Sequence, residues 1–438
     1  MKLFEQLGQS IKKQPLLWGI ALLFVLPPVG MAWLLILAFA SLIATFKKRQ
    51  KLTIDLIAIL LLAITAASLV VTLLKHGKMA FFSTLMMIGY STVYLFLSSG
   101  RTAKLNVRLF AWIGIAGGLY ITVSDKFFAW IMHIFVHLPN GLLLLDGNLL
   151  LGFRYRDRLF GSAYNPNYAC YLLILALALL FVEWLCAIRK AQYRIIWLFA
   201  LFALILDYGI YDTGSRAGFA IMLGLHLLFL LFYRKWLFVG LAILAGVLTP
   251  VIIHLMPRAN STHSSLVTRQ DIWGNSLHVF FKHPWFGTTA FGFPHAYKAV
   301  AGSSQSHPHN IFLAIFASSG VICGLLFLLL LAAGVYWVFA ALYHDGVQNY
   351  NAQLYLFALP TIIAYGMMDF TLSSPQIMLV VLALCAFWSD YLKRLGLLQP
   401  VGSLLLPRLF GKNTNRSDTY QRQAAARFTD AGLTERKL

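Results

Sequence analysis

MPRANSTHSSLVTRQDIWGNSLHVFFKHPWFGTTAFGFPHAYKAVAGSSQSHP (residues 256–308) is a polar stretch that ends against an apolar run, HNIFLAIFASSGVICGLLF (residues 309–327). The apolar run has the length and composition of a segment that crosses about 30 Å of hydrocarbon. Membrane proteins keep the connections between their helices short unless a connection carries function. The polar stretch carries four cations, Arg258, Arg269, Lys282 and Lys298. This contrast predicts a membrane protein whose chemistry lies in one large loop.

The composition of the whole chain agrees with that interpretation. Of its 438 residues 60% are hydrophobic and 11% charged, with a mean hydropathy of +0.75, which excludes a soluble globular enzyme. Recurrent apolar runs predict an all-α integral membrane protein with about twelve transmembrane helices and one large extracytoplasmic loop, residues 256–308. The first run has no small-residue cleavage site, so no cleavable signal is expected. The expected spans are 14–26, 29–46, 53–74, 79–99, 107–124, 164–187, 193–210, 215–233, 236–255, 309–339, 352–371 and 376–395.

Membrane topology explains most of the net charge of +20. With a cytoplasmic N-terminus, the expected spans place most lysines and arginines on the cytoplasmic side, as the positive-inside rule requires. This pattern predicts cytoplasmic N- and C-termini, a membrane domain over residues 1–395 and a basic, flexible cytoplasmic tail over 396–438. The tail is expected to rest on anionic lipid, and nucleic acid is not an expected partner.

Most of the remaining cations lie in a few segments expected outside, namely 154–158, 216 and 258–298. Because the positive-inside trend should deplete cations there, their concentration indicates an anionic ligand at the outer face.

The segment RDRLFGSAYNPNYAC (156–170) predicts the start of a helix, because asparagine is favoured where the first amides of a helix need acceptors. A helix start accounts for Asn165 and Asn167 but not for the alternating arginines upstream. We expect at least one of these three to contact phosphate: Arg154, Arg156 and Arg158.

The segment DTGSRAGFA (212–220) joins two expected spans by a tight turn, so Arg216 enters the membrane at the start of the second span. An intramembrane arginine is costly unless it faces a polar cavity or a partner, although it can also snorkel to the interface. Since Gly214 and Gly218 allow a ligand or a helix to come close, we favour a site residue.

The segment TRQDIWGNSLHVFFKHPWFG (268–287) has the apolar period of an amphipathic helix. It is typical of a re-entrant or surface helix anchored by Trp273 and Trp285. Arg269 is either a ligand of the expected anion or the partner of Asp271.

The segment SHPHNIFLAIFASSG (306–320) gives the strongest local signal. Pro308 pre-sets a helix start and predicts that His309 lies in the first turn, where the positive potential favours a neutral imidazole. A neutral histidine can take a proton from a hydroxyl, and the same amide-rich end attracts phosphate. Alternatively His309 is an ordinary interface residue. Metal binding by His307 and His309 fits poorly, because no carboxylate or cysteine stands nearby in the sequence.

Asp369, in MMDFTLSSP, lies near the outer end of an expected span. Three roles are open for it: orienting His309, orienting an outer arginine, or capping a helix.

In this order the segments resemble the O-antigen ligase and polymerase family of bacterial membrane glycosyltransferases, which have a GT-C-like architecture. The resemblance covers residues 150–320 closely. The matching motifs are Arg158–Gly161–Asn165–Pro166–Asn167, Ser215–Arg216–Ala217–Gly218, Arg269–Trp273 and His309–Asn310.

The resemblance implies inverting transfer of a glycan from an undecaprenyl diphosphate carrier to an acceptor hydroxyl, at the outer face of the bacterial cytoplasmic membrane. It implies no metal, no other cofactor and no nucleotide sugar, and a glycan, glycolipid or protein as acceptor. Arg216 and Arg269 match the diphosphate-binding arginines and His309 matches the base. The other expected substrate contacts are Arg154, Arg156, Arg158, Asn167, Asn310, Asp369 and His307, the last also an alternative base.

Two other functions stay open. A polymerase of the same family joins lipid-linked repeat units and uses the same leaving group, so the residues do not separate it from a ligase. We favour the ligase because the Ser-Arg and His-Asn segments are clear. A transporter or flippase belongs to a different class, but it is expected to show internal repeats and broken helices at mid-membrane, and no convincing repeat is present.

Overall fold

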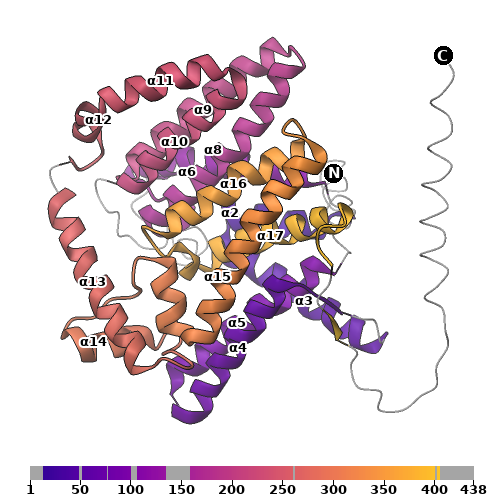
Figure 1. Cartoon of the computed structure of the whole chain (residues 1–438), viewed down its shortest axis with the longest axis vertical. Coiled ribbons are helices and arrows are strands. Elements are labelled where there is room, and N and C mark those ends of the chain that lie inside the picture. Colours follow the sequence, from indigo (N-terminus) through magenta and orange to yellow (C-terminus); the bar gives the residue numbers. More distant parts are fainter. Residues whose placement is uncertain are drawn as a thin grey trace. The chain divides into compact units, whose positions relative to one another are not determined.

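The structure is a computed structural model that describes residues 13–48, 52–75, 77–99, 106–134, 158–259, 262–399 and 402–404 (Figure 1). The N-terminal part forms the helices α2 (Pro15–Val25), α3 (Pro27–Lys47), α4 (Leu56–Lys75), α5 (Lys78–Ser98) and α6 (Val107–Ile134). The middle part forms the 3-10 turn η2 (Gly161–Ala163) and the helices α8 (Pro166–Arg189), α9 (Tyr193–Asp212), α10 (Arg216–Tyr233), α11 (Lys235–Val247) and α12 (Thr249–Leu255).

The C-terminal part contains α13 (Thr262–Lys282), α14 (Phe293–Ala301), α15 (Ile311–Asp345), α16 (Tyr350–Gly366), the 3-10 turn η4 (Thr371–Ser373) and α17 (Pro375–Arg394). Two three-residue strands, β1 (Leu52–Ile54) and β2 (Gly402–Leu404), form a two-stranded sheet. Residues Met1–Ser403 form one compact unit. From residue 405 onward the predicted tail lies outside the described residues.

Nine helices in the described ranges are long and apolar enough to cross a membrane, and ten if α11 and α12 count as one bent span. The prediction of a helical membrane protein is therefore confirmed, whereas the count of twelve spans is not. Each expected span has a helix at its position, but three of them have no single helix that is long and apolar enough to cross. The short α2 has 11 residues, α16 has 17, and α11 and α12 meet at 75°.

Helix α8 forms the centre of the membrane unit. It packs against α6, α9, α10 and α16, and nearly all its side chains are buried. A helix that is apolar on every side is stable only when other helices surround it, as here. Its charged and amide side chains lie towards its two ends: Asn165 caps the first turn, and Glu183 and Arg189 stand in the last two turns. These two ends position the polar sites described below.

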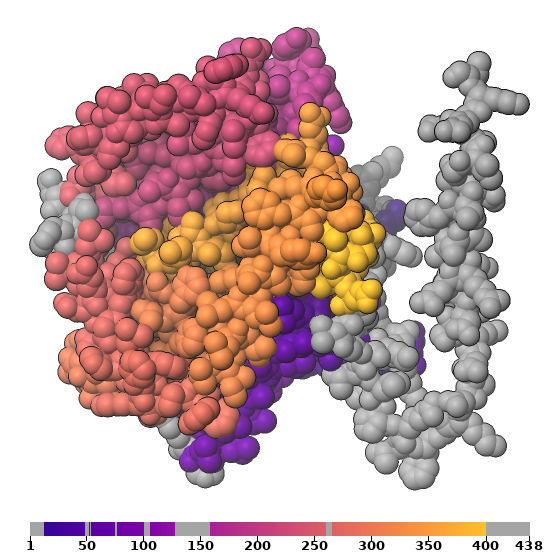
Figure 2. Space-filling view, viewed as in Figure 1, coloured from indigo at the N-terminus to yellow at the C-terminus, as the bar shows by residue number. Residues whose placement is uncertain are grey.

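The expected polar loop, residues 256–308, contains helical structure. Helix α13 packs against α14 and α15, and Ile272, Val279, Phe293, Tyr297 and Ala317 form a small separate core. Figure 2 shows this region in salmon and α15 and α16 in orange, next to the violet surface of α4 and α5. The amphipathic helix predicted over 268–287 is confirmed as far as Lys282. The segment is helical because its apolar stripe packs into this small core.

Helix α15 is interrupted at Gly320, whose φ of 82° and ψ of −179° are not helical. The segment 284–289 lies along the break: Thr288 N donates to Ala317 O, Thr289 N to Ser318 O, and Val321 N to Pro284 O. Backbone that leaves the helix inside a membrane protein is tolerated where other groups satisfy it. The break thus fixes the polar segment against the first part of α15, which follows His309.

Candidate active site

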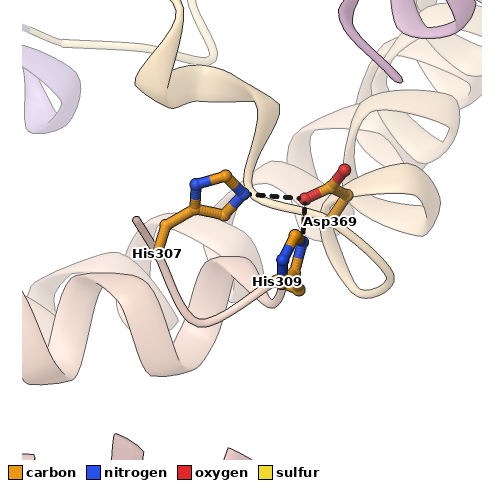
Figure 3. Close-up of side chains that lie close together, drawn as sticks. All are labelled: His307, His309 and Asp369. Atoms are coloured by element: carbon orange, nitrogen blue, oxygen red, sulfur yellow. Dashed lines mark hydrogen bonds and ion pairs between the residues drawn. The ribbon is translucent and has the colours of Figure 1, made fainter. Parts of the chain in front are cut away.

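A buried carboxylate, Asp369, joins two histidines from a distant part of the chain (Figure 3). Its Oδ1 atom lies 2.8 Å from His309 Nδ1 and 3.1 Å from His307 Nε2, and it also accepts a hydrogen bond from Phe370 N at 2.8 Å. The Asp369 side chain is only 4% exposed. Of the three open roles, the geometry therefore favours orientation of His309.

The two histidines differ in the contacts of the ring nitrogen that does not face Asp369. An ionised carboxylate only accepts hydrogen bonds, so both nitrogens that face Asp369 carry their protons and donate. The second nitrogen of His307, Nδ1, is 2.9 Å from Ser306 Oγ and accepts its hydroxyl proton. The second nitrogen of His309, Nε2, makes no hydrogen bond with any described residue. In this arrangement His309 is the histidine with a lone pair to offer.

Burial raises the pKa of the Asp369 carboxyl, but the hydrogen bonds from His307 and His309, and the attraction of either imidazole when it is protonated, outweigh it. They hold the pKa well below its usual range. A carboxylate that stays ionised fixes the tautomer of a neighbouring imidazole and stabilises the imidazolium that forms when it takes up a proton.

The other carboxylate oxygen connects Asp369 to the start of α8. Asn167 Nδ2 donates to Asp369 Oδ2 at 2.6 Å, and Arg158 Nη2 donates to Asn167 Oδ1 at 2.9 Å. Arg158 Nε also donates to Thr213 O at 2.6 Å. The predicted helix start is confirmed, with Asn165 accepting from Asn167 N as the cap of α8. The helix entry and its arginine therefore belong to one hydrogen-bonded network with His309.

A cluster of three guanidinium groups lies near the α9–α10 turn. Arg216 Nη1 donates to Arg258 O at 3.4 Å, and the charges of Arg258 and Arg269 both act on Arg216. Gly214 (φ 67°) lies close to both this cluster and Arg158. A Cβ built on Gly214 would lie 3.1 Å from Arg158 Nε and 3.2 Å from Arg258 Cδ, tighter than ordinary packing. A side chain at this position would need a strained backbone and would press on both arginines, so glycine suits the turn.

The structure corrects one sequence expectation about His309. The helix does not include it: α15 begins at Ile311, and the Asn310 side chain caps it by accepting from Phe312 N and Leu313 N. His309 stands before the cap with a φ of 53°, a conformation uncommon for a side chain with a Cβ. The Asn310 Nδ2 atom donates to Met367 O at 3.1 Å, which ties the start of α15 to the segment that carries Asp369. Asp369, not a helix terminus, is therefore the group that orients the His309 ring.

The predicted residues thus fall into two groups. The described residues His307, His309, Asp369, Asn167 and Arg158 form one contact network, whereas Arg216 and Arg269 belong to the guanidinium cluster with Arg258. No ion pair joins Arg269 and Asp271, although both lie in the described part of the chain. Arg154 and Arg156 lie outside the described residues.

Two residues of the candidate site were given no role from the sequence. Arg258 was counted among the outer cations but given no role. Tyr365 was not considered: its hydroxyl donates to Asn167 O at 3.1 Å and lies 3.1 Å from Ser215 Oγ. A tyrosine inside an apolar run gives no indication in the sequence that its hydroxyl contacts polar residues far away along the chain.

The site also bears on metal binding. Ligand atoms of His307, His309 and Asp369 lie within 4.8 Å of one another, a set that could hold a metal ion. The sequence argument against metal assumed that no carboxylate stood nearby, and that assumption is wrong. The same atoms are also at hydrogen-bonding distance, so both states fit the distances.

The fold and this site define a multi-pass membrane protein with a carboxylate-oriented histidine and an arginine cluster. Residues 198–328 match the family model described as O-antigen ligase, which confirms the resemblance that the motifs predicted. The match includes Arg216, Arg269 and His309, whereas Arg158, Asn167 and Asp369 lie outside it. A search of curated proteins gives no match. The helices and the family together indicate a multi-pass protein of the bacterial inner membrane that carries out O-antigen ligase- or polymerase-like glycan transfer with a lipid-linked glycan and an acceptor.

Proposed function

We propose that the protein transfers a glycan from a polyisoprenyl diphosphate carrier to an acceptor hydroxyl, with inversion and without a metal ion, at the outer face of the membrane. The observation that carries this proposal is the orientation of His309. Its Nδ1 atom is held 2.8 Å from Asp369, so that Nε2 is the atom available to a substrate.

In the proposed step one bond forms and one bond breaks at the anomeric carbon of the sugar. The acceptor oxygen attacks the anomeric carbon of the sugar while its proton moves to His309 Nε2. The bond from the anomeric carbon to the phosphate oxygen breaks, and its electron pair leaves with the polyisoprenyl diphosphate. The imidazolium that forms on His309 is stabilised by the Asp369 carboxylate. Attack from the face opposite the leaving group inverts the anomeric configuration.

The guanidinium cluster suits the leaving group. The charges of Arg258 and Arg269 repel that of Arg216, and a diphosphate placed among them would relieve this repulsion. Guanidinium groups meet phosphate oxygens through paired hydrogen bonds, which strengthen as negative charge grows on the leaving group. Stabilising that charge is the largest contribution such residues make to rate. Arg158, fixed by Thr213 and Asn167, is proposed as a further donor contact.

A large apolar cavity supports a lipid-linked donor. Its volume is about 770 Å³, and its lining includes Ile311, Met367 and Phe370, which are close neighbours in sequence of His309 and Asp369. Nearly all the other lining residues are apolar side chains of α4, α5, α15, α16 and α17. A cavity of this composition suits an isoprenoid chain whose diphosphate lies in the polar site.

Purified protein, a lipid-diphosphate glycan and candidate acceptors test this proposal. The expected result is release of free carrier diphosphate together with glycan attached to the acceptor. Movement of the intact lipid-linked glycan across a vesicle wall would instead identify a transporter. If the product is a longer lipid-linked glycan, the enzyme is a polymerase; if a different acceptor carries the glycan, it is a ligase, which we favour.

A further inference from the structure

A second polar cavity lies at the opposite end of α8 from the candidate active site. Its volume is about 530 Å³, and it is formed by the ends of α6, α8, α16 and α17. The lining residues that matter here are Arg108, Arg189, Lys190, Arg394, Asn106 and Asn351.

The position of this cavity follows from the length of α8. The helix has 24 residues, so its ends are separated by about 36 Å, which exceeds the roughly 30 Å of membrane hydrocarbon. Asn167 of the candidate active site stands at one end and Arg189 at the other. The cavity therefore lies at the opposite membrane–water boundary, where the headgroups of the other leaflet are found.

One cation of the cavity is neutralised within the protein. Arg108 pairs with Glu183, whose side chain is fully buried, through Nε–Oε1 at 2.8 Å and Nη2–Oε2 at 2.6 Å. Tyr350 donates to the same carboxylate at 2.9 Å. This pair fixes one wall of the cavity and contributes little net charge.

The other cations are not matched in this way. Arg189 is held by neutral groups, donating to the buried Gln353 Oε1 and to Cys186 Sγ, both at 3.0 Å. The Lys190 backbone N–H donates to Cys186 O at 3.2 Å, but its ammonium group makes no hydrogen bond or ion pair with any described residue. Arg394 is 3.8 Å from Asp390 and 60% exposed, which is a weak pair. Arg189 and Lys190 thus leave a positive charge in a preformed cavity.

We propose that this cavity binds the phosphodiester headgroup of an anionic glycerophospholipid. A fixed guanidinium beside an ammonium group is suited to phosphate oxygens, and the amides of Asn106 and Asn351 suit the hydroxyls of a glycerol headgroup. The volume lies within the range of small-molecule sites. Basic pockets between membrane helices bind such headgroups. Free phosphate shares part of this chemistry, but the place of the cavity at the ends of membrane helices favours the lipid.

The test measures lipid binding to the full-length purified protein by native mass spectrometry and by thermal shift. The probes are phosphatidylglycerol, phosphatidylcholine and inorganic phosphate. The first variant combines Arg189→Gln with Lys190→Gln. Its matched control combines Arg234→Gln with Lys235→Gln, which removes the same charge at the junction of α10 and α11, where neither residue lines the cavity.

We expect the first variant to bind phosphatidylglycerol roughly 30-fold more weakly, and the control to bind like the parent. Lys190→Gln alone, which disturbs no hydrogen bond, should lose roughly fivefold and covers the case in which the double variant folds poorly. Equal loss in the control, equal binding of phosphatidylcholine, or displacement of the lipid by millimolar inorganic phosphate would each overturn the proposal. Since binding is measured and not transfer, the result is independent of the proposed function.

Discussion

The histidine–carboxylate network and the guanidinium cluster are organised in opposite ways. Both carboxylate oxygens of Asp369 and both ring nitrogens of His307 are held by short hydrogen bonds, and Nε2 of His309 makes none with any described residue. At Arg216, Nη1 lies 3.4 Å from Arg258 O, and the nearby charges of Arg258 and Arg269 have the same sign as its own. The first region is ordered by attraction, whereas the second brings like charges together, which an anion would stabilise. The proposed base is therefore pre-organised, and the proposed anion site is expected to be most stable with the donor bound.

The largest effect is expected from His309→Ala, because it removes the imidazole nitrogen, Nε2, that no described residue holds and that we propose as the base. Transfer measured as carrier diphosphate release should fall by about 10³-fold or more, within the range of general base catalysis. His295→Ala, in the exposed part of α14, is the matched control and should keep full activity. Full activity in His309→Ala, with loss in His307→Ala, would assign the base to His307 instead.

Arg216→Ala tests the guanidinium cluster. It should reduce transfer by about 10²–10³-fold, because it removes a charge proposed to stabilise the leaving diphosphate. Arg269→Ala is expected to act similarly. Arg234→Ala, at the opposite end of α10, removes the same charge from the same helix and should have little effect. Equal turnover in Arg216→Ala and the control would remove the guanidinium cluster from the mechanism.

Asp369→Asn should lower transfer by roughly 10- to 100-fold, because an amide of the same shape no longer fixes the tautomer of His309. Steady-state kinetics would show the loss mainly in kcat, since Asp369 is not proposed to bind the donor. A loss confined to KM would mean that Asp369 serves the substrate and not His309.

The low pKa of Asp369 predicts a pH dependence of stability. The folded pKa lies below the ordinary value of 3.8, so the carboxylate stabilises the fold above that value and the contribution is lost as the pH falls towards the folded pKa. Asp369→Asn should therefore lower the Tm at pH 7, and its difference from the parent should shrink below about pH 4. A difference that does not change with pH would contradict the ionised state of Asp369.

The smallest effect is expected from metal removal. Under the proposed mechanism, dialysis against a strong chelator leaves transfer unchanged, because hydrogen bonds alone connect His307, His309 and Asp369. Loss of activity that added Zn²⁺ or Mn²⁺ restores would show that these residues hold a metal, and would replace the base mechanism.

Local sequence patterns predicted much of the fold. Asn165 and Ser215 are caps where the sequence indicated helix starts, since capping depends on a few neighbouring residues. The same reasoning failed at His309, which was predicted to lie in the first turn of the helix. In the structure Asn310 is the cap, so His309 stands one residue before it. It also counted one span over 236–255, where the chain bends by 75° at Leu248. Apolarity reports where a helix can lie but not whether it is straight.

The membrane class, the positions of the helices and the residues of the Ser-Arg and His-Asn motifs were predictable from the sequence, because periodicity, caps and intramembrane cations are local properties. The contacts of Asp369 with His309, His307 and Asn167, and the contact of Arg258 with Arg216, emerged only from the folded chain. The residues in these pairs are at least 42 positions apart along the chain. A hydrogen bond forms only when folding brings its atoms to within about 3 Å, and no spacing in a sequence encodes that distance.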